Sequence, residues 1–177
     1  LTPRAQGGMQ KMEVVFKRVE TPAEIETVAC IAEPIWHETY DGITGPAATR
    51  YMVEQFQSVP AIRRQLDAEG YVYYLMLCGG EAAGFVGLVP HKEGKMFLSK
   101  LYVSKAHRGE GLPRAAFDFV AERCRAEGLD RIYLTVNKRN THAIEVYRHF
   151  GFYEIDAVVT DIGCGYVMDD YILQKDV

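Results

Sequence analysis

The stretch LSKLYVSKAHRGEGLPRAAFDFV (98–120) decides the fold, because it combines a strand, a glycine turn and a helix. Its first part, up to about Ser104, has the pattern of a strand, and an amphipathic helix begins near Gly111. The first turn of a helix has unpaired N–H groups and the positive end of the helix dipole. Glycine has no Cβ, so an anion can approach the backbone closely. The turn therefore predicts an anion site that would suit a pyrophosphate.

Two nucleotide-binding motifs fail to match this turn. The phosphate loop GxxxxGK[ST] needs a lysine followed by a hydroxyl residue, and that pair is missing here. A dinucleotide fingerprint needs three glycines in an early βαβ unit, whereas Pro113 replaces the third glycine and the turn follows a meander. Proline is compatible with the first turn of a helix, where its missing N–H has no intrahelical partner. The flanking Arg108 and Arg114 are either phosphate ligands or solvated charges.

The remaining sequence predicts a chain of the order β-α-α-α-β-β-β-α-β-α-β-β. Thr21, Pro22 and Glu24 form a capping box at the start of the first helix, Pro34 is expected to end or kink that helix, and 42–46 is expected to be a loop. Three hairpin-linked strands before a βαβ crossover indicate a mixed sheet with helices on both faces. The predicted strands are 12–20, 71–78, 82–91, 95–104, 131–137, 152–160 and 165–175, and the predicted helices are 21–40, 47–58, 60–70, 111–128 and 140–151.

A second stretch, LTVNKRNTHAIEVYRHFGFYEI (134–155), completes a resemblance to a known family. The first stretch resembles the acetyl-CoA-binding motif Q/R-x-x-G-x-G/A of the GNAT superfamily of N-acetyltransferases, with Arg108, Gly111 and Pro113 at its three defined positions. The second is similar to the strand–helix unit that follows it in those enzymes; the matching positions are Asn140, Ala143, Tyr147, Gly151 and Phe152. The resemblance covers nearly the whole chain from about residue 12. It implies an α/β (α+β) fold, with a mixed, mostly antiparallel sheet of about seven strands, a V-shaped splay, and one domain over 9–177.

The resemblance also implies acetyl-CoA as cofactor and indicates the residues that hold it. The pantetheine arm would lie between the strands at 97–103 and 131–136, and the pyrophosphate would rest on the backbone of the glycine turn. Asn140 would hydrogen-bond the pantetheine arm, or would serve only as a helix cap. The expected cofactor-binding residues are Leu101, Tyr102, Val103, Arg108, Gly109, Glu110, Gly111, Leu112, Pro113, Arg114 and Asn140.

Tyr147 matches the general acid that is common in this family. A phenol keeps its proton at neutral pH and can protonate the departing thiolate, while a backbone N–H near Leu101 would stabilise the carbonyl oxygen. The alternative is that Tyr147 only packs in the core. Many relatives have a glutamate base about two residues before Leu101, where this chain has Ser99. A water chain or a group from 36–41 is the expected substitute.

The acceptor is expected to be a primary amine of a small molecule. Trp36, Tyr40 and Asp41 combine aromatic faces with a carboxylate, which suits a cationic amine. Helix-end packing is the alternative interpretation of these three residues. The segment is similar to the bacterial spermidine/spermine acetyltransferase group, so a polyamine is preferred. Two other hypotheses are an acetyltransferase for protein N-termini or lysines, and a non-catalytic acyl-CoA-binding module.

Composition sets the remaining expectations. The chain has 177 residues, 48% hydrophobic content and a net charge of −4, which fits one domain and disfavours a general nucleic-acid binder. Its four cysteines form no CxxC pair, which favours free thiols in a reducing, cytoplasmic compartment and no metal site. The sequence contains no membrane-length apolar stretch and leaves open whether the protein forms a homodimer. Residues 1–8 are interpreted as a cloning remnant, with Met9 or Met12 as the natural start.

Overall fold

The computed structural model describes residues 13–177. The interpretation of residues 1–8 and of the two candidate start methionines therefore lies outside the described residues. Within 13–177, no helix combines the length and apolar character that crossing a bilayer requires.

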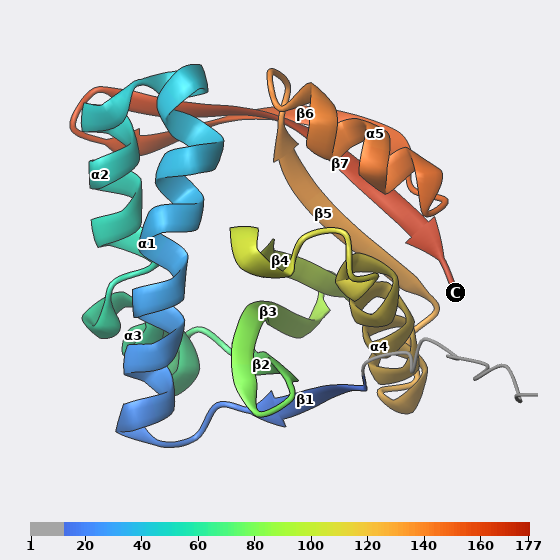
Figure 1. Cartoon of the computed structure of the whole chain (residues 1–177). Helices are drawn as coiled ribbons and strands as arrows, with labels where there is room; N and C mark the ends of the chain where they lie inside the picture. Colours follow the sequence, from blue (N-terminus) through green and yellow to red (C-terminus); the bar gives the residue numbers. More distant parts are fainter. Residues whose placement is uncertain (1–12) are drawn as a thin grey trace, which may run out of the picture.

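One seven-stranded sheet, in the order β1-β2-β3-β4-β5-β7-β6, organises the chain (Figure 1). Its strands are β1 (Val14–Arg18), β2 (Val72–Cys78), β3 (Glu81–Lys92), β4 (Lys95–Val103), β5 (Arg131–Asn137), β6 (Tyr153–Gly163) and β7 (Tyr166–Asp176). The helices are α1 (Pro22–Thr44), α2 (Pro46–Phe56), α3 (Val59–Ala68), α4 (Leu112–Ala126) and α5 (Thr141–His149), with a short 3₁₀ turn η1 (Lys105–His107). The predicted order of elements is confirmed, and all pairs except β4–β5 are antiparallel.

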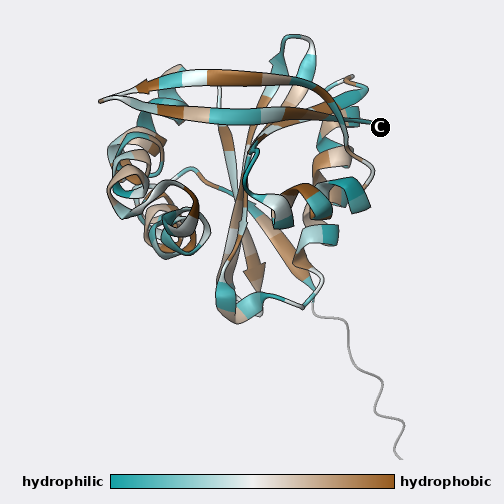
Figure 2. Ribbon diagram, turned by 90° about the horizontal axis from the view of Figure 1, so that it is seen from above, coloured by the Kyte–Doolittle hydropathy of each residue, from teal (hydrophilic) through white to brown (hydrophobic). Residues whose placement is uncertain are grey.

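Helices cover both faces of the sheet, as predicted. Figure 2 shows the sheet nearly edge-on between two groups of helices. On one face, apolar residues of α4 and α5, such as Phe117 and Ile144, pack on β5 residues such as Leu134. On the other face, α1–α3 pack on β2 and β3 through a second core that includes Trp36 and Phe85. The mixed α/β sheet with helices on both faces is the predicted fold class.

The two central strands, β4 and β5, separate soon after they meet. Their parallel ladder consists of Met96 opposite Ile132 and Phe97 opposite Tyr133, and it extends no further. Beyond Phe97, the β5-facing edge of β4 has no ladder partner among the described strands. Backbone N–H and C=O groups require partners, so this edge is available to a ligand. The predicted V-shaped splay is confirmed.

A bulge in β4 decides which side chains face each side of the splay. Gly87 of β3 pairs with Lys100, but Leu88 pairs with Leu98, so Ser99 is one residue extra on β4. A single inserted residue reverses the alternation of side chains along the rest of a strand. Lys100 therefore lies on the face covered by α1–α3 rather than on the face of Leu98.

The first helix is longer than the sequence predicts. Its capping box is present, because the Thr21 hydroxyl accepts from the Glu24 amide and the Glu24 carboxylate accepts from the Thr21 amide. However, the helix continues past Pro34 to Thr44. The sequence predicts that it ends or kinks near Pro34, and the prediction of an end there is wrong. Pro34 leaves the carbonyl of Cys30 without a helical donor, and both residues are exposed, so water can replace the lost hydrogen bond.

The predicted loop at 42–46 is also wrong. Only Gly45, with φ of 87°, separates α1 from α2. A left-handed glycine can end one helix and lead directly into another that begins with Pro46. The compact corner keeps α2 beside α1, where both helices border the site described next.

Candidate active site

The splay between β4 and β5 opens into a cavity of about 480 Å³, here called the splay cleft. Its walls come from α1, β4, the start of α4, β5 and α5. The predicted residues that line it are Tyr40, Leu101, Tyr102, Val103, Arg108, Pro113, Asn140 and Tyr147. Residues predicted separately from three stretches of sequence therefore meet around one cavity.

The glycine turn at the mouth of this cleft has the geometry of an anion site. Gly109 and Gly111 have φ of 81° and 80°, and a Cβ built on either would meet nothing within 4 Å. No side chain caps the start of α4, so its first N–H groups have no side-chain acceptor there. Pro113 lies in the first turn of α4, where the sequence predicts that it is tolerated. The turn accordingly fits the pyrophosphate of a nucleotide cofactor.

The charged side chains of the turn already have partners within the chain. Arg108 donates to the carboxylate of Glu38 on α1 at 2.7 Å, and the guanidinium of Arg114 lies 5.4 Å from the centre of the Phe150 ring. Glu110 pairs with His107 at 3.1 Å. Any phosphate contact at this turn would therefore come first from the backbone and would compete with Glu38 for Arg108.

Tyr147 projects from α5 into the splay cleft. Its ring packs at right angles to Phe117 and Phe152, with centroid distances of 6.0 and 5.7 Å. Burial raises the pKa of the Tyr147 phenol above its usual range, and Tyr40 adds to the rise. The phenol is thus protonated at neutral pH and can act as a donor. On the same helix, the Asn140 side chain accepts from the Ala143 amide at 3.3 Å and so caps α5.

Aromatic side chains connect the cleft to a second cavity. The Tyr40 and Tyr102 hydroxyls lie 3.3 Å apart, and the Trp36 ring packs against both rings, with centroid distances of 5.0 and 5.5 Å. Trp36 and Tyr40, two predicted acceptor-binding residues, are therefore in contact. The third, Asp41, accepts a hydrogen bond from His37 at 2.8 Å and lines neither cavity.

The second cavity, of about 500 Å³, lies under the β6–β7 hairpin and is here called the hairpin cavity. Figure 1 shows this hairpin reaching across to α1 and α2, and the Tyr51 hydroxyl of α2 donates to the carbonyl of Ile162 near its tip. The aromatic residues that line the cavity are Trp36, Tyr40, Phe56, Tyr71, Phe97 and Tyr102. Its charged residues are Lys92, Lys100, Asp161 and Asp170.

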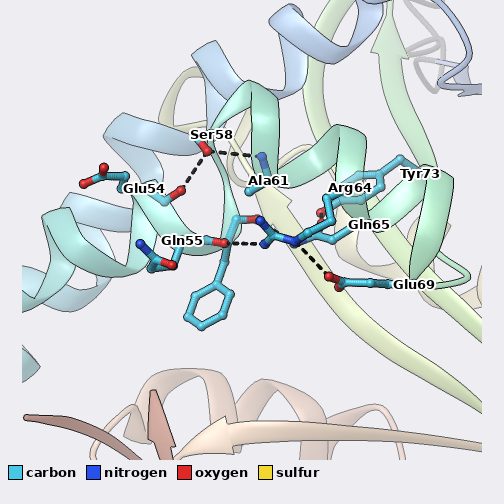
Figure 3. Close-up of polar contacts among 9 residues, drawn as sticks. Glu54, Gln55, Ser58, Ala61, Arg64, Gln65, Glu69 and Tyr73 are labelled. Atoms are coloured by element: carbon cyan, nitrogen blue, oxygen red, sulfur yellow. Dashed lines mark hydrogen bonds and ion pairs between the residues drawn. The ribbon is translucent and has the colours of Figure 1, made fainter. Parts of the chain in front are cut away.

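A network at the corner between α2 and α3 holds Phe56 in this cavity. Ser58 donates to the carbonyl of Glu54 at 2.7 Å and accepts from the Ala61 amide at 3.3 Å, as Figure 3 shows. Buried Gln65 donates to the carbonyl of Phe56 at 2.9 Å and accepts from the Tyr73 hydroxyl at 2.6 Å. The corner is thus fixed by side chains on α3 and β2.

Lys100 is buried in the hairpin cavity because of the bulge at Ser99. Its stem packs over Gly87, where a Cβ would lie only 2.8 Å from the lysine Cγ. Its ammonium lies 5.1 Å from the Trp36 ring and 5.5 Å from the Phe56 ring. Burial lowers the pKa of Lys100 to about 8, and Glu69 opposes the shift.

Asp170 of β7 is a residue of this cavity that the sequence does not predict. It lies opposite Asn137 of β5 and Val158 of β6, and its side chain is 4% exposed. Its Oδ1 is buried without a hydrogen-bond partner in the described chain. Burial raises the pKa of the Asp170 carboxyl to about 6; Asp169 adds to the rise and Lys138 opposes it. The sequence did contain a signal for a buried acid here. Asp169 and Asp170 are adjacent in a strand, and alternation turns one of two adjacent side chains inward.

The two cavities meet at the splay. Tyr40, Ser99, Tyr102 and Thr135 line both of them. Ser99, which stands where the family resemblance would place a glutamate, is hydrogen-bonded to the Tyr71 hydroxyl at 2.9 Å. A group held in the splay cleft can therefore face a group held in the hairpin cavity across the bulge of β4.

The architecture agrees with one protein family. The sequence profile of the acetyltransferase (GNAT) family matches residues 35–152, which include α1, the β4–β5 splay, the glycine turn and α5. The chain belongs to the GNAT acetyltransferase family. The predicted family is thus confirmed.

Curated relatives match a part of this GNAT chain. It is 33% identical over 84 residues to the "Probable spermine N(1)-acetyltransferase" of Bacillus subtilis subsp. natto, which covers 41% of this chain and 53% of the relative. It is 32% identical over 98 residues to the "Uncharacterized N-acetyltransferase YjgM" of Escherichia coli, with 54% and 57% covered. The chain thus spans about half the length of the curated relatives that it matches.

Solved structures of GNAT enzymes share the fold. The PaiA N-acetyltransferase of Thermoplasma acidophilum, in complex with coenzyme A, aligns with a TM-score of 0.77 at 18% identity, covering 94% of this chain and 100% of that one. A GNAT acetyltransferase of Elizabethkingia anophelis with acetyl-CoA bound aligns with a TM-score of 0.62 at 13% identity, with 94% and 99% covered. These similarities establish the fold of nearly the whole chain.

Proposed function

We propose that this chain transfers the acetyl group of acetyl-CoA to a primary amine of a small molecule. The observation that carries the proposal is the meeting of two cavities at the β4–β5 splay, with a half-buried phenol, Tyr147, on one side. One cavity has an uncapped helix start and an open strand edge. The other has aromatic walls and carboxylates. This arrangement provides for an anionic acyl donor and a cationic acceptor.

The donor would be held by backbone groups more than by side chains. The free edge of Leu101, Tyr102 and Val103 can pair with the amides of the pantetheine arm, as a strand would. The first N–H groups of α4, beside Gly109 and Gly111, can bind the pyrophosphate. When bound there, acetyl-CoA supplies a thioester, the activated form of the acetyl group.

Tyr147 is proposed as the general acid. The neutral amine nitrogen forms a bond to the acetyl carbon, the C–S bond breaks, and the departing sulfur takes the phenol proton of Tyr147. The nitrogen then loses one N–H proton, which passes through water to restore the phenol. A protonated, partly buried hydroxyl on the wall of the cleft supports this role. A backbone N–H near Leu101, beside the bulge, can stabilise the negative charge that develops on the carbonyl oxygen.

A polyamine-like acceptor is proposed as the first class to test. Matched relatives include the "Spermine/spermidine N(1)-acetyltransferase" of Bacillus subtilis, 32% identical over 84 residues, with 41% of this chain and 53% of the relative covered. The aromatic lining and Asp161 and Asp170 of the hairpin cavity suit an alkylammonium group.

The test measures free thiol released from acetyl-CoA with spermine, spermidine, putrescine, phenethylamine, lysine and a peptide with a free N-terminus. We expect release that depends on a small amine, and Tyr147→Phe should lower kcat about 100-fold with little change in the KM for acetyl-CoA. Tyr153→Phe removes a hydroxyl that bonds Asp176 at the exposed edge of the sheet, and it serves as the control. Unchanged kcat in Tyr147→Phe would remove the acid role.

The same panel separates the two alternative functions. Acetylation of the peptide alone would favour a protein acetyltransferase. Tight binding of coenzyme A without turnover of any amine would indicate a non-catalytic binding module.

A further inference from the structure

We propose that Asp170 binds the ammonium group of the acceptor and removes its proton, in place of the β4 carboxylate that Ser99 replaces. The proposal rests on the proposed function, which requires an amine with a free lone pair. It assigns the base to β7, on the opposite side of the splay from β4.

The first argument is the state of the side chain. Asp170 is 4% exposed, lines the hairpin cavity and leaves Oδ1 without a partner in the described chain. A buried carboxylate with an unpaired oxygen is unfavourable for folding. By contrast, its neighbour Asp169 is exposed and bonds Lys138 at 3.0 Å. An acid kept buried and unpaired at a cavity wall is suited to a cationic ligand rather than to stability.

The second argument is position. Asp170 lines the hairpin cavity and not the splay cleft, whereas Tyr147 lines the splay cleft and not the hairpin cavity. Tyr40 lines both cavities and pairs with Tyr102. Asp170 therefore stands on the acceptor side of the tyrosines, and Tyr147 stands on the donor side.

The third argument is the balance of charge around Asp170. The titratable and charged groups that line its cavity or shift its pKa come from several elements: Tyr40 (α1), Tyr71 (before β2), Lys92 (β3), Lys100 and Tyr102 (β4), Lys138 (after β5), Asp161 (β6) and Asp169 (β7). Of the lysines, Lys100 is held against the rings of Trp36 and Phe56, and Lys138 is paired with Asp169. No hydrogen bond or ion pair joins these lysines to Asp170 in the described chain, so its carboxylate remains free for a substrate cation.

The proton then follows a balanced path. An N–H bond of the ammonium breaks, and its proton forms an O–H bond on Asp170. The freed lone pair forms the N–C bond as the C–S bond of the thioester breaks, and Tyr147 protonates the sulfur. The acylated nitrogen then loses a second proton, which passes through water to restore the phenol of Tyr147, and Asp170 releases the first proton to water.

Binding of the amine tests the first half of the proposal without acetyl-CoA. The amine used is the one from the panel that gives the fastest thiol release, or spermidine if no amine gives any. It is added to wild type, Asp170→Asn and Asp169→Asn, and the shift in Tm of each protein is measured. We expect the amine to raise the Tm of wild type and of Asp169→Asn, and to leave Asp170→Asn unshifted. Equal shifts in all three proteins would overturn the proposal.

The pH dependence of kcat/KM tests the second half. Wild type should reach a plateau above about pH 7, because the ionised Asp170 binds the ammonium form and removes its proton. Asp170→Asn can use only free amine, so its kcat/KM should be about 100-fold lower at pH 7 and should keep rising about tenfold per pH unit. Equal profiles overturn the role of Asp170 while leaving the proposed function intact. If wild type shows no amine-dependent thiol release, the proposed function is overturned. The proposed proton transfer to Asp170 is then overturned as well.

Discussion

At the scale of the residue, Lys100 and Asp170 are ionisable groups buried in the same cavity. Burial moves both pKa values toward the neutral form, to about 8 for Lys100 and about 6 for Asp170. Each charge is therefore unfavourable for folding at neutral pH. Groups that reduce stability in this way are common where a cavity must bind or react.

Lys100→Met should increase stability at neutral pH. The unfolded chain keeps the Lys100 proton up to its ordinary pKa of 10.5, and the folded chain keeps it only up to about 8. Its cost to folding is thus fully present below pH 8 and disappears as the pH rises toward 10.5. Urea unfolding should show a gain of about 2–3 kcal/mol at pH 7 that shrinks by pH 10.

Methionine keeps the unbranched stem of Lys100 over Gly87, so this variant tests the charge more than the packing. The exposed Lys105→Met is the control and should show no pH-dependent gain. A loss of stability in Lys100→Met at pH 7 would mean that the aromatic contacts of the ammonium outweigh its desolvation.

At the scale of the element, the start of α4 and the bulge of β4 build the site. The sequence predicted the first, since glycines before a helix indicate an anion site from local chemistry alone. It could not predict the second, because strict alternation would place Lys100 and Tyr102 on the same face as Leu98. Only the pairing with β3 shows that Ser99 is inserted. The sequence also could not predict that α1 continues past Pro34, because this depends on whether water can reach the carbonyl that lacks a helical donor.

Gly111→Ala, compared with Gly128→Ala, should separate cofactor binding from backbone strain. Both glycines have left-handed φ, 80° and 72°, with nothing within 4 Å of a built Cβ, and they lie at opposite ends of α4. Each alanine should lower the free energy of unfolding by about 1 kcal/mol. Only Gly111→Ala should raise the KM for acetyl-CoA, by about tenfold, since its methyl group would lie in the turn that is proposed to bind the pyrophosphate. Equal KM values in steady-state assays would argue against that site.

At the scale of the whole molecule, the splay between β4 and β5 lets two cavities share residues of both strands. The motifs on β4, α4 and α5 predicted the donor side. Asp170 reaches the acceptor side because β7 inserts between β5 and β6, which sets it opposite Asn137. That contact joins two segments with no shared local motif, so no pattern within either could reveal it. A cytoplasmic location and a homodimer remain predictions.

The position of the coenzyme A sulfur in a crystal structure of the complex tests the two-sided site most directly. We expect the pantetheine arm along Leu101–Val103 in the splay cleft, and the sulfur within hydrogen-bond reach of the Tyr147 hydroxyl, at about 3.5 Å or less. The sulfur should also face the hairpin cavity across Ser99 and Thr135. A pantetheine arm outside the splay, or a sulfur turned away from Tyr147 and the hairpin cavity, would contradict the proposed arrangement.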